Sequence, residues 1–455
     1  MCGILGFFGN LNKSQFSFAL KALSHRGPDR SASFHNKKCK INLGHTRLSI
    51  IDLSTNGNQP MVSKDKKVVI VFNGEIYNFF SLKFTLEQVG YKFQGNSDTE
   101  VLLNLYLHLG DKMFSKIKGI FSFAIWDQRV NSLLISRDAF GVKPLYYSQG
   151  NNHFAFASEI KSLVHLLPDT KKLDVEALQN YLTFLWCPGE GTPLENVKKL
   201  KPGEALWIKN SKVEKKIVWY EFPCLPKTKQ NLKKEEAISG LVSKLRRSVH
   251  RQMISDVPIG SFLSGGLDSS SIVYFAKELN PNIPCFTIET DGGADSGFKS
   301  DLTYAKILAK KLHVPLEVVT INSKNIAIDI ENMVFQLDEP LADPAALNVL
   351  YISELARKQG IKVLLSGTGG DDILTGYRRH TALKLEKIFL LFPDFCKKNF
   401  KFFTSRLNQK NSLFRRLSKF STGLSMEPHE KLANYFCWSQ RSDLMELYSD
   451  DFKSA

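Results

Sequence analysis

Glycine, serine and aspartate residues are concentrated in the stretch Ser261–Ser271, which has the sequence SFLSGGLDSSS. A short apolar run ending at Ile259 precedes it, and apolar residues at helical spacing follow from Ser270 to Leu279. The pattern predicts a strand, a tight loop and a helix. Gly265 and Gly266 let consecutive backbone amides face an anion, and the positive end of the following helix adds to the same site. The stretch therefore predicts a phosphate-binding loop.

The side chains of this loop support the same interpretation. The hydroxyls of Ser264, Ser269 and Ser270 can donate hydrogen bonds, and Asp268 can hold Mg²⁺ against phosphates. No lysine followed by serine or threonine comes after the glycines, so this is not the usual NTPase loop. SGG followed by DS resembles the pyrophosphate loop of enzymes that cleave ATP between its α and β phosphates. Such enzymes adenylate a carboxylate or carbonyl group, and nitrogen or sulfur then displaces AMP.

A second glycine loop, Ser366-Gly367-Thr368-Gly369-Gly370-Asp371-Asp372, follows an expected strand at 361–366. Further strands are expected at 283–288 and 315–321, with helical stretches between them, which predicts a parallel sheet covered on both faces. Ligands of such folds bind at the carboxyl ends of the strands. Asp371 is therefore expected beside Asp268 on the metal, and Asp338-Glu339-Pro340 near the same edge.

Near the other end of the chain, Cys2 can act as a nucleophile. Removal of Met1 would leave a thiol and a free α-amine on one residue, and the amine, with a reference pKa of roughly 7.7–8.0, could accept the thiol proton. Three further signals follow: a strand carrying Arg47, the apolar strand Val68–Phe72 closed by the turn Asn73–Asn78, and a helix start at Ser97–Glu100.

In that order, Cys2, the Arg47 strand, NGEIYN and SDTE resemble the glutaminase domain of class II glutamine amidotransferases. The resemblance implies an α+β N-terminal-nucleophile sandwich (αββα). It also implies that Cys2 attacks the glutamine amide carbon, while Asn73 and Gly74 hold the oxyanion. Arg47 would bind the glutamine α-carboxylate, and Glu75 and Asp98 its α-ammonium group. The expected glutamine-binding residues are Arg47, Leu48, Ser49, Ile50, Ile51, Asn73, Gly74, Glu75 and Asp98.

Taken as a whole, the chain resembles glutamine-hydrolysing asparagine synthetases. The resemblance implies an α/β parallel-sheet pyrophosphate-loop domain, with ATP and Mg²⁺ as cofactors, glutamine and aspartate as substrates, and a homodimer. It places backbone contacts to adenine at Leu263 and Ile288. The expected ATP-binding residues are Leu263, Ser264, Gly265, Gly266, Asp268, Ser269, Ile288, Ser366 and Gly367, and the expected metal ligands are Asp268 and Asp371.

The chain departs from that family at three places. Thr368 stands where an acid that helps to form the intermediate is expected, and threonine cannot act as that base. Pro344-Ala345-Ala346 stands where an arginine for the aspartate α-carboxylate is expected. The chain also stops at Phe452–Ala455, in what we expect to be the middle of a helix, so a fragment or short form is expected. Aspartate remains the default acceptor, and a sugar uronate in surface-polysaccharide assembly is the alternative.

The length and composition of the chain indicate its domain organisation and its cellular location. With 455 residues, 43% hydrophobic and 23% charged, the chain is expected to form a glutaminase domain over 1–208, a lysine-rich linker over 209–234 and a synthetase domain over 235–455. It has neither a run of eighteen apolar residues nor a secretory signal, so a cytoplasmic protein is expected. Seven scattered cysteines without CxxC spacing argue against a disulfide scaffold and a zinc site.

The net charge of +16 raises other interpretations. The basic and aromatic segment 384–420 could lie on a membrane surface or over an anionic substrate, but a helical subdomain with a basic outer face is preferred. An RNA-modifying pyrophosphate-loop enzyme would use the charge but would not need a glutaminase domain, so no nucleic-acid partner is expected. A catalytically silent interaction protein would have no reason to keep Cys2, Asn73 and Asp98 with both glycine loops.

Overall fold

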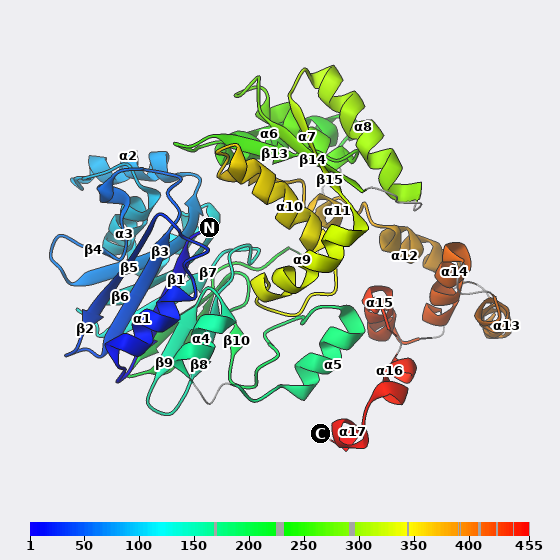
Figure 1. Ribbon diagram of the computed structural model, residues 1–455, viewed down its shortest axis with the longest axis horizontal. Helices are drawn as coiled ribbons and strands as arrows, with labels where there is room; N and C mark the ends of the chain where they lie inside the picture. Colours follow the sequence, from blue (N-terminus) through cyan, green and yellow to red (C-terminus); the bar gives the residue numbers. More distant parts are fainter. Residues whose placement is uncertain are drawn as a thin grey trace.

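The computed structural model describes residues 1–167, 171–223, 232–290, 296–343, 345–389, 391, 393–407, 411–424, 426–439 and 441–454. These residues form an N-terminal domain of two stacked sheets, a second domain around a parallel sheet, and a set of helices at the C-terminal end (Figure 1).

Two antiparallel sheets lie face to face in the N-terminal domain. The first has the order β10-β8-β9-β1-β3-β2 and the second β12-β11-β7-β6-β5-β4. The strands of the first sheet are β1 (Gly3–Phe8), β2 (Arg30–Asn36), β3 (Ile41–Arg47), β8 (Tyr146–Gln149), β9 (Phe154–Ala157) and β10 (Lys198–Lys199). Those of the second are β4 (Met61–Val62), β5 (Val68–Ile76), β6 (Gly119–Asp127), β7 (Ser132–Arg137), β11 (Glu204–Lys209) and β12 (Lys212–Val218).

Helices cover the outer faces of this pair of sheets. Helices α1 (Lys13–Lys21) and α4 (Ile160–Leu166) pack on the first sheet, and α2 (Phe79–Gln88) and α3 (Asp98–Leu109) on the second. Two 3₁₀ helices, η1 (Thr55–Gly57) and η2 (Gly110–Ser115), and helix α5 (Val175–Phe184) complete the domain. This arrangement confirms the predicted αββα sandwich.

Strand β5 shows why the layers form. Its side chains alternate: Val68, Ile70 and Phe72 join the core under α2 and α3, whereas Val69 and Val71 join the core between the sheets. An apolar run at period two that is buried on both faces belongs in the middle of stacked layers. Asn73 and Gly74 do not end this strand as the predicted turn. They continue β5 and pair with Ser122 and Phe121 of β6.

The expected linker 209–234 needs a correction. Its first part contains strand β12 (Lys212–Val218), which pairs antiparallel with β11 at the edge of the second sheet. Lysine-rich composition is a feature of edge strands as well as linkers, because charged side chains protect an open edge from further pairing. After this strand, Trp219 stacks on Phe114 and Phe121 of the core. Residues 224–231 lie outside the described part.

The second domain is built on a parallel sheet of order β15-β14-β13-β16. Val249 of α6 and Val273 of α7 pack on one face, and Ile352 of α10 packs on the other, as predicted for a sheet covered on both sides. The strands are β13 (Ile259–Phe262), β14 (Cys285–Thr290), β15 (Leu316–Ile321) and β16 (Val363–Leu365). The helices are α6 (Lys234–Gln252), α7 (Leu267–Ala276), α8 (Ser296–Leu312), α9 (Ser323–Gln336), α10 (Ala345–Lys358) and α11 (Gly370–Ile373).

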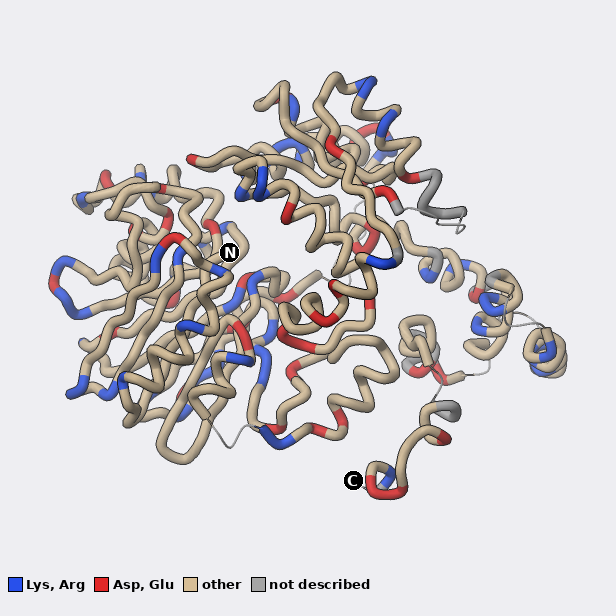
Figure 2. The backbone as a smooth tube through the Cα atoms, in the orientation of Figure 1, with Lys and Arg blue, Asp and Glu red and all other residues tan. Residues whose placement is uncertain are grey.

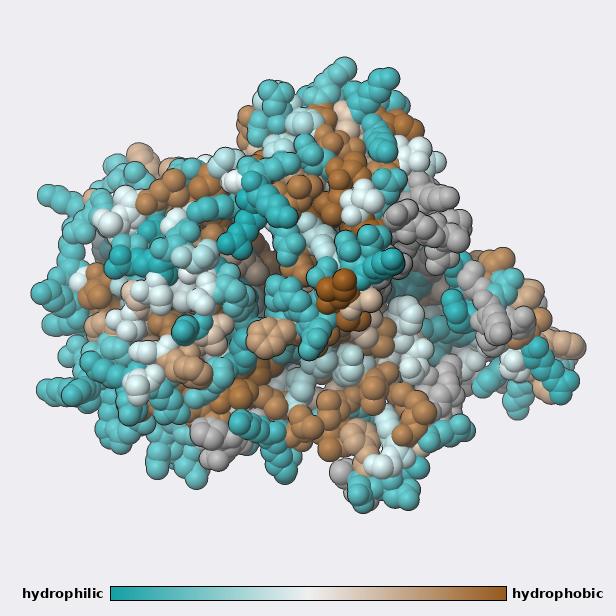
Figure 3. Space-filling model, viewed as in Figure 1, coloured by the Kyte–Doolittle hydropathy of each residue, from teal (hydrophilic) through white to brown (hydrophobic). Residues whose placement is uncertain are grey.

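The C-terminal helices lie to one side of this domain (Figure 1). They are α12 (Arg378–Phe389), α13 (Asp394–Ser405), α14 (Ser412–Gly423), α15 (Pro428–Phe436), α16 (Arg441–Leu447) and α17 (Asp450–Ser454). The basic segment 384–420 is therefore helical, as expected, where the structure describes it. Hydrophobic and hydrophilic residues both appear on the visible face of these helices (Figure 3). None of the described helices combines the length and the apolar character needed to cross a bilayer.

Candidate active sites

A pocket in the N-terminal domain gathers most of the predicted glutamine-binding residues. It opens between the start of β1, the end of β3, the loop that follows β3, the middle of β5 and the start of α3. Its lining comprises Met1, Cys2, Arg47, Leu48, Ile50, Ile51, Gly57, Gln59, Phe72, Asn73, Gly74, Glu75, Ser97, Asp98, Thr99 and Lys143. Ser49 is the one predicted glutamine-binding residue that does not line it.

Cys2 lies directly before β1 and contacts the loop after β3. The Leu48 backbone N–H donates to the Cys2 sulfur over 3.4 Å, and the thiol lies 3.7 Å from the Leu48 carbonyl oxygen. Burial raises the pKa of the Cys2 thiol, so a base is needed to generate the thiolate. Burial also lowers the pKa of the Met1 amine to about 5, which favours a neutral terminal amine in this pocket.

Asn73 offers an unused donor. Its side chain is 1% exposed, and its Nδ2 has no hydrogen-bond partner among the described residues. A buried amide without a partner is unfavourable unless a ligand supplies the acceptor. Beside it, a Cβ added to Gly74 would lie 2.2 Å from the Ile120 carbonyl oxygen, so the close approach of β6 requires glycine here.

Arg47 is held by the loop that follows its strand. Nη1 donates to the Ser54 carbonyl over 2.9 Å and to Asn58 Oδ1 over 2.8 Å, and Nη2 donates to the Asp52 carbonyl. Three of the five guanidinium N–H groups thus fix the side chain, which leaves two for a ligand carboxylate. Arg47 is only 6% exposed and its guanidinium is held by these bonds, so its position is set before any ligand binds.

Two carboxyl groups line the same pocket. Burial raises the pKa of Asp98 to about 7, with the nearby Glu75 charge adding to it, although the Ile76 N–H donates to Asp98 Oδ2 over 3.0 Å. Burial also raises the pKa of Glu75. Asp98 begins α3, where Ser97 is the N-cap and accepts from the Glu100 N–H. A buried acidic pair of this kind suits a ligand ammonium group.

Sequence reasoning missed several residues of this pocket. Gln59 joins its walls, because its Oε1 accepts from the Phe72 N–H over 2.6 Å and its Nε2 donates to Thr99 Oγ1 over 3.1 Å. Lys143, which follows β7, was not among the predicted site residues; it lines the pocket, and burial lowers its pKa.

In the second domain, the two predicted glycine loops meet. Loop 263–270 runs from the end of β13 into the first turn of α7, and loop 366–371 runs from the end of the adjacent strand β16 into the start of α11. A Cβ on Gly367 would lie 2.7 Å from the Ser269 nitrogen, and one on Gly370 would lie 2.2 Å from Asp268 Oδ2. The glycines therefore permit this contact. Within the first loop, the Ser264 N–H donates to Ser269 Oγ over 3.1 Å, and Gly266 N–H to Ser264 Oγ over 3.1 Å.

The two expected metal ligands lie together at this junction. Burial and the neighbouring charge of Asp371 raise the pKa of Asp268, and the Asp371 N–H donates to the Asp268 carboxylate. Two adjacent carboxylates fit a hard cation such as Mg²⁺, which accepts few protein ligands when phosphates supply the others. Among the described residues, no group of three or more His, Cys, Asp or Glu side chains could hold a metal.

The other predicted nucleotide contacts lie around these loops. Leu263 follows β13, and its N–H donates to the Phe286 carbonyl over 2.9 Å. Ile288 pairs with Val319 inside the sheet. Thr368 is exposed, and its hydroxyl lies 2.6 Å from that of Ser366. Pro344, the first residue of the stretch Pro344-Ala345-Ala346 that departs from the family, lies outside the described residues.

Asp338 and Glu339, which were expected near this edge, both direct their carboxylates at the N-terminal domain. Asp338 accepts hydrogen bonds from the Ile160 and Lys161 N–H groups, at the first turn of α4 in the other domain. Glu339 accepts from Tyr146 Oη over 2.7 Å and pairs with Lys199 over 2.8 Å. Both carboxylates therefore have partners at the domain interface. The first N–H groups of a helix and a buried lysine stabilise a carboxylate more strongly than an open loop does.

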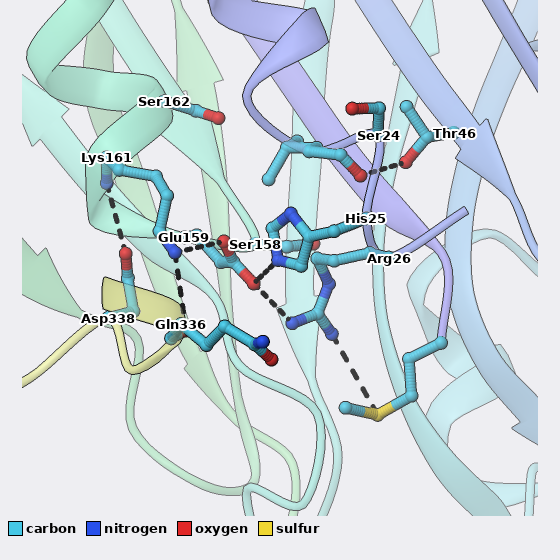
Figure 4. Close-up of polar contacts among 12 residues, drawn as sticks. Ser24, His25, Arg26, Thr46, Ser158, Glu159, Lys161, Ser162, Gln336 and Asp338 are labelled. Carbon is cyan, nitrogen blue, oxygen red and sulfur yellow. Dashed lines mark hydrogen bonds and ion pairs between the residues drawn. The ribbon is translucent and has the colours of Figure 1, made fainter. Parts of the chain in front are cut away.

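Figure 4 shows the part of this interface around Glu159, which pairs with Arg26 over 2.8 Å and with Lys161 over 3.2 Å. The Arg26 side chain also donates to the Cys2 carbonyl over 3.0 Å. Arg26 and the neighbouring His25 hold the pKa of Glu159 at about 2 against the effect of burial, which alone would raise it. One ionic cluster therefore connects the backbone of Cys2 to the second domain.

This fold and these sites place the chain in the class of two-domain proteins that carry a glutamine amidotransferase domain, with the Cys2 thiol in one domain and paired glycine loops in the other. Family comparisons agree: residues 1–220 match a glutamine amidotransferase domain and residues 240–446 match asparagine synthase. The chain belongs to the glutamine-hydrolysing asparagine synthetase family.

Several relatives support this assignment. Asparagine synthetase 1 of Bacillus subtilis is 36% identical over 88% of this chain and 62% of its own length. A putative asparagine synthetase 2 of Methanocaldococcus jannaschii is 34% identical over 84% of this chain and 76% of its own length. The amidase chry2 of Gibberella zeae is 29% identical over 83% of this chain and 59% of its own length. The chain thus spans about three-fifths of the length of two of these relatives.

Proposed function

We propose that this chain makes amides by moving nitrogen from glutamine to a carboxylate that it activates with ATP. The observation that carries the proposal is the single pocket in which Cys2, Arg47, Asn73 and Asp98 meet, in a chain that also brings two glycine loops together. Neither feature alone implies a synthetase. Their combination fits an enzyme that produces ammonia in one domain and uses it in the other.

The first half-reaction is glutamine hydrolysis. Once Met1 is removed, the α-amine of Cys2 accepts the thiol proton, and the thiolate attacks the glutamine amide carbon. Asn73 Nδ2 and the Gly74 N–H donate to the oxyanion, which collapses to a thioester and releases ammonia. Water then hydrolyses the thioester to glutamate. Arg47 binds the α-carboxylate of the substrate, and Glu75 and Asp98 bind its α-ammonium group.

The second half-reaction is carboxylate activation. The Gly265 amide and the hydroxyls of Ser264 and Ser269 bind the ATP phosphates, and a carboxylate oxygen attacks the α-phosphorus to release pyrophosphate. Asp268 and Asp371 would hold Mg²⁺, which neutralises phosphate charge when bound. Ammonia attacks the acyl-adenylate, and AMP leaves as the amide forms. Keeping this intermediate apart from bulk water prevents its hydrolysis.

Aspartate is the proposed acceptor, since the relatives named asparagine synthetase match most of the chain. A sugar uronate is the second candidate, and Thr368 favours it. An exposed hydroxyl bonded to Ser366 cannot take a proton from ammonia as a carboxylate would. A relative named amidase also shows that the family is not confined to one name. The homodimer remains a prediction.

The test uses the full chain with glutamine and ATP-Mg²⁺ and measures AMP release with aspartate and with a panel of uronates. AMP release with aspartate supports an asparagine synthetase. Release only with a uronate moves the enzyme to the second candidate. Glutamate release without AMP from any carboxylate would contradict the synthetase half of the proposal.

A further inference from the structure

The loop after β3 has two sides. Residues 48–58, which we name the Arg47 loop, line the glutamine pocket through Leu48, Ile50, Ile51 and Gly57. The Leu48 N–H contacts the Cys2 sulfur, and the carbonyls of Asp52 and Ser54 hold the Arg47 guanidinium. The conformation of this loop therefore sets both the nucleophile contact and the carboxylate-binding side chain.

The opposite side of the loop is held by the second domain. The Asp52 N–H donates to Asp256 Oδ2 over 2.7 Å, and the Asp256 N–H donates to the Ile50 carbonyl over 2.9 Å. Asp52 has a backbone φ of 54°, in the left-handed region, which is uncommon for residues other than glycine. Its own carboxylate accepts from the N–H groups of Ser54 and Asn96. The reciprocal pair of bonds with Asp256 thus fixes a residue on which several others depend.

A second contact reaches the same loop. The Ser49 N–H donates to Asp29 Oδ2 over 2.8 Å, and the Lys362 ammonium of the second domain pairs with that same oxygen over 3.0 Å. This explains why Ser49 does not line the pocket although its neighbours do. Its backbone is directed outward, toward an aspartate that the second domain holds.

Both contacts originate next to the strands that carry the glycine loops. Asp256 lies three residues before β13, which leads into loop 263–270, and Lys362 lies directly before β16, which leads into loop 366–371. The two strands are neighbours in the sheet, with Ile259 opposite Val363. They are four and three residues long. At roughly 3.3 Å per extended residue, the glycine loop at 366 begins about 13 Å from Lys362, and the one at 263 begins at most about 23 Å from Asp256.

We propose that the Arg47 loop couples the two sites, with Asp256 and Lys362 as positioning residues that set glutamine affinity from the synthetase domain. The inference rests on the proposed function and names the contacts through which the two sites affect each other. Because coupling of binding free energies is reciprocal, nucleotide bound at the glycine loops changes glutamine affinity through these contacts, and glutamine changes nucleotide affinity by the same factor. Neither residue lies in the glutamine pocket.

The test compares Asp256→Ala, Asp256→Asn and Lys362→Ala with the wild-type chain, and Lys358→Ala serves as a control from the exposed end of α10. Glutamate release is measured against glutamine concentration, with and without ATP-Mg²⁺. Asp256→Ala is expected to raise KM for glutamine about tenfold while kcat stays within about twofold, since it removes a charge-assisted hydrogen bond. Lys362→Ala acts through an exposed ion pair, so about threefold is expected.

The Asp256→Asn variant keeps an acceptor oxygen and is expected to retain most of the affinity for glutamine. In wild type, ATP-Mg²⁺ is expected to change KM for glutamine, and this response is lost in Asp256→Ala. A merely structural role would instead lower the thermal midpoint without separating KM from kcat. An unchanged KM in Asp256→Ala, or an equal rise in Lys358→Ala, would overturn the proposal.

Hydrogen exchange of residues 48–58 provides a measurement that does not need catalysis. We expect faster exchange in Asp256→Ala than in wild type or Asp256→Asn. If wild type released no glutamate, the proposed function would fail, while faster exchange would still support the contact between domains. Unchanged exchange in Asp256→Ala would reject the loop contact even in an active enzyme.

Discussion

The glutamine pocket and the glycine-loop junction belong to one chain but are built differently. In the pocket, Asn73 is 1% exposed, Asp98 5% and Arg47 6%, and each is fixed by a strand or helix start. At the junction, Ser264, Ser366 and Thr368 are exposed and lie on loops. The first site places its donors and charges before any ligand arrives, whereas the second presents hydroxyl-bearing residues on exposed loops.

Their glycines show the same contrast. Gly74 lies in a strand, where an added Cβ would meet the Ile120 backbone at 2.2 Å, whereas at Gly266 the nearest atom would be the rotatable Ser264 hydroxyl at 3.2 Å. Packing dictates glycine in the pocket, and anion access favours it in the loop. A preorganised pocket suits chemistry on a small neutral amide, and an open loop suits a large, highly charged ligand that brings its own cation.

Figure 2 adds the distribution of charge, with lysine and arginine residues spread over both domains. The net charge of +16 therefore does not identify either site. The two regions differ in packing. The functional side chains of the glutamine pocket are buried between packed elements, whereas those of the glycine-loop junction lie on exposed loops. The predictions below separate them.

The largest effect is expected from Cys2→Ala. Removing the only atom that can form the thioester should reduce glutamine-dependent turnover by at least about 10⁴-fold. Ammonia-dependent AMP release with the carboxylate identified by the acceptor screen should remain, because the glycine loops lie in the other domain. The measurement is AMP release with glutamine and then with ammonium chloride. Equal loss with both nitrogen donors would show that the two sites do not work separately.

Asp268→Asn should act in the opposite domain. Loss of one of the two paired carboxylates should reduce ATP-dependent pyrophosphate release by about 100-fold. Basal glutamate release should stay within about twofold of wild type, since Asp268 lies in the other domain and does not line the pocket. Pyrophosphate and glutamate are measured in the same reaction. Undiminished ATP consumption would reject the metal assignment.

The smallest effect concerns pH. The Asp98 pKa of about 7, raised chiefly by burial, means that its carboxyl group is mostly neutral at pH 6 and mostly ionised at pH 8. A ligand ammonium group binds the ionised form better, so KM for glutamine should fall about tenfold as pH rises from 6 to 8. Glutamate release measured across this range tests it, with Asp98→Asn expected to bind weakly and to show a flat profile. A KM that rises with pH would contradict the role of Asp98.

The sequence by itself determined the local parts of this protein. Alternation in Val68–Phe72, the cap at Ser97 and the order of strand, glycines and helix at 259–276 depend on neighbours within a few residues, so the pattern predicts them. The same holds for Cys2, Arg47, Asn73, Glu75 and Asp98, whose motifs are short and specific.

The tertiary structure decided which residues from distant parts of the chain contact each other. Nothing local shows that Asp338 caps α4 of the other domain, that Gln59 and Lys143 line the pocket, or that Lys212–Val218 forms an edge strand. Asp256 and Lys362 look like ordinary surface charges in the sequence, yet both hold the Arg47 loop. A charged side chain takes the partner that packing brings within hydrogen-bond distance, and that partner is 333 residues away in the case of Lys362 and Asp29.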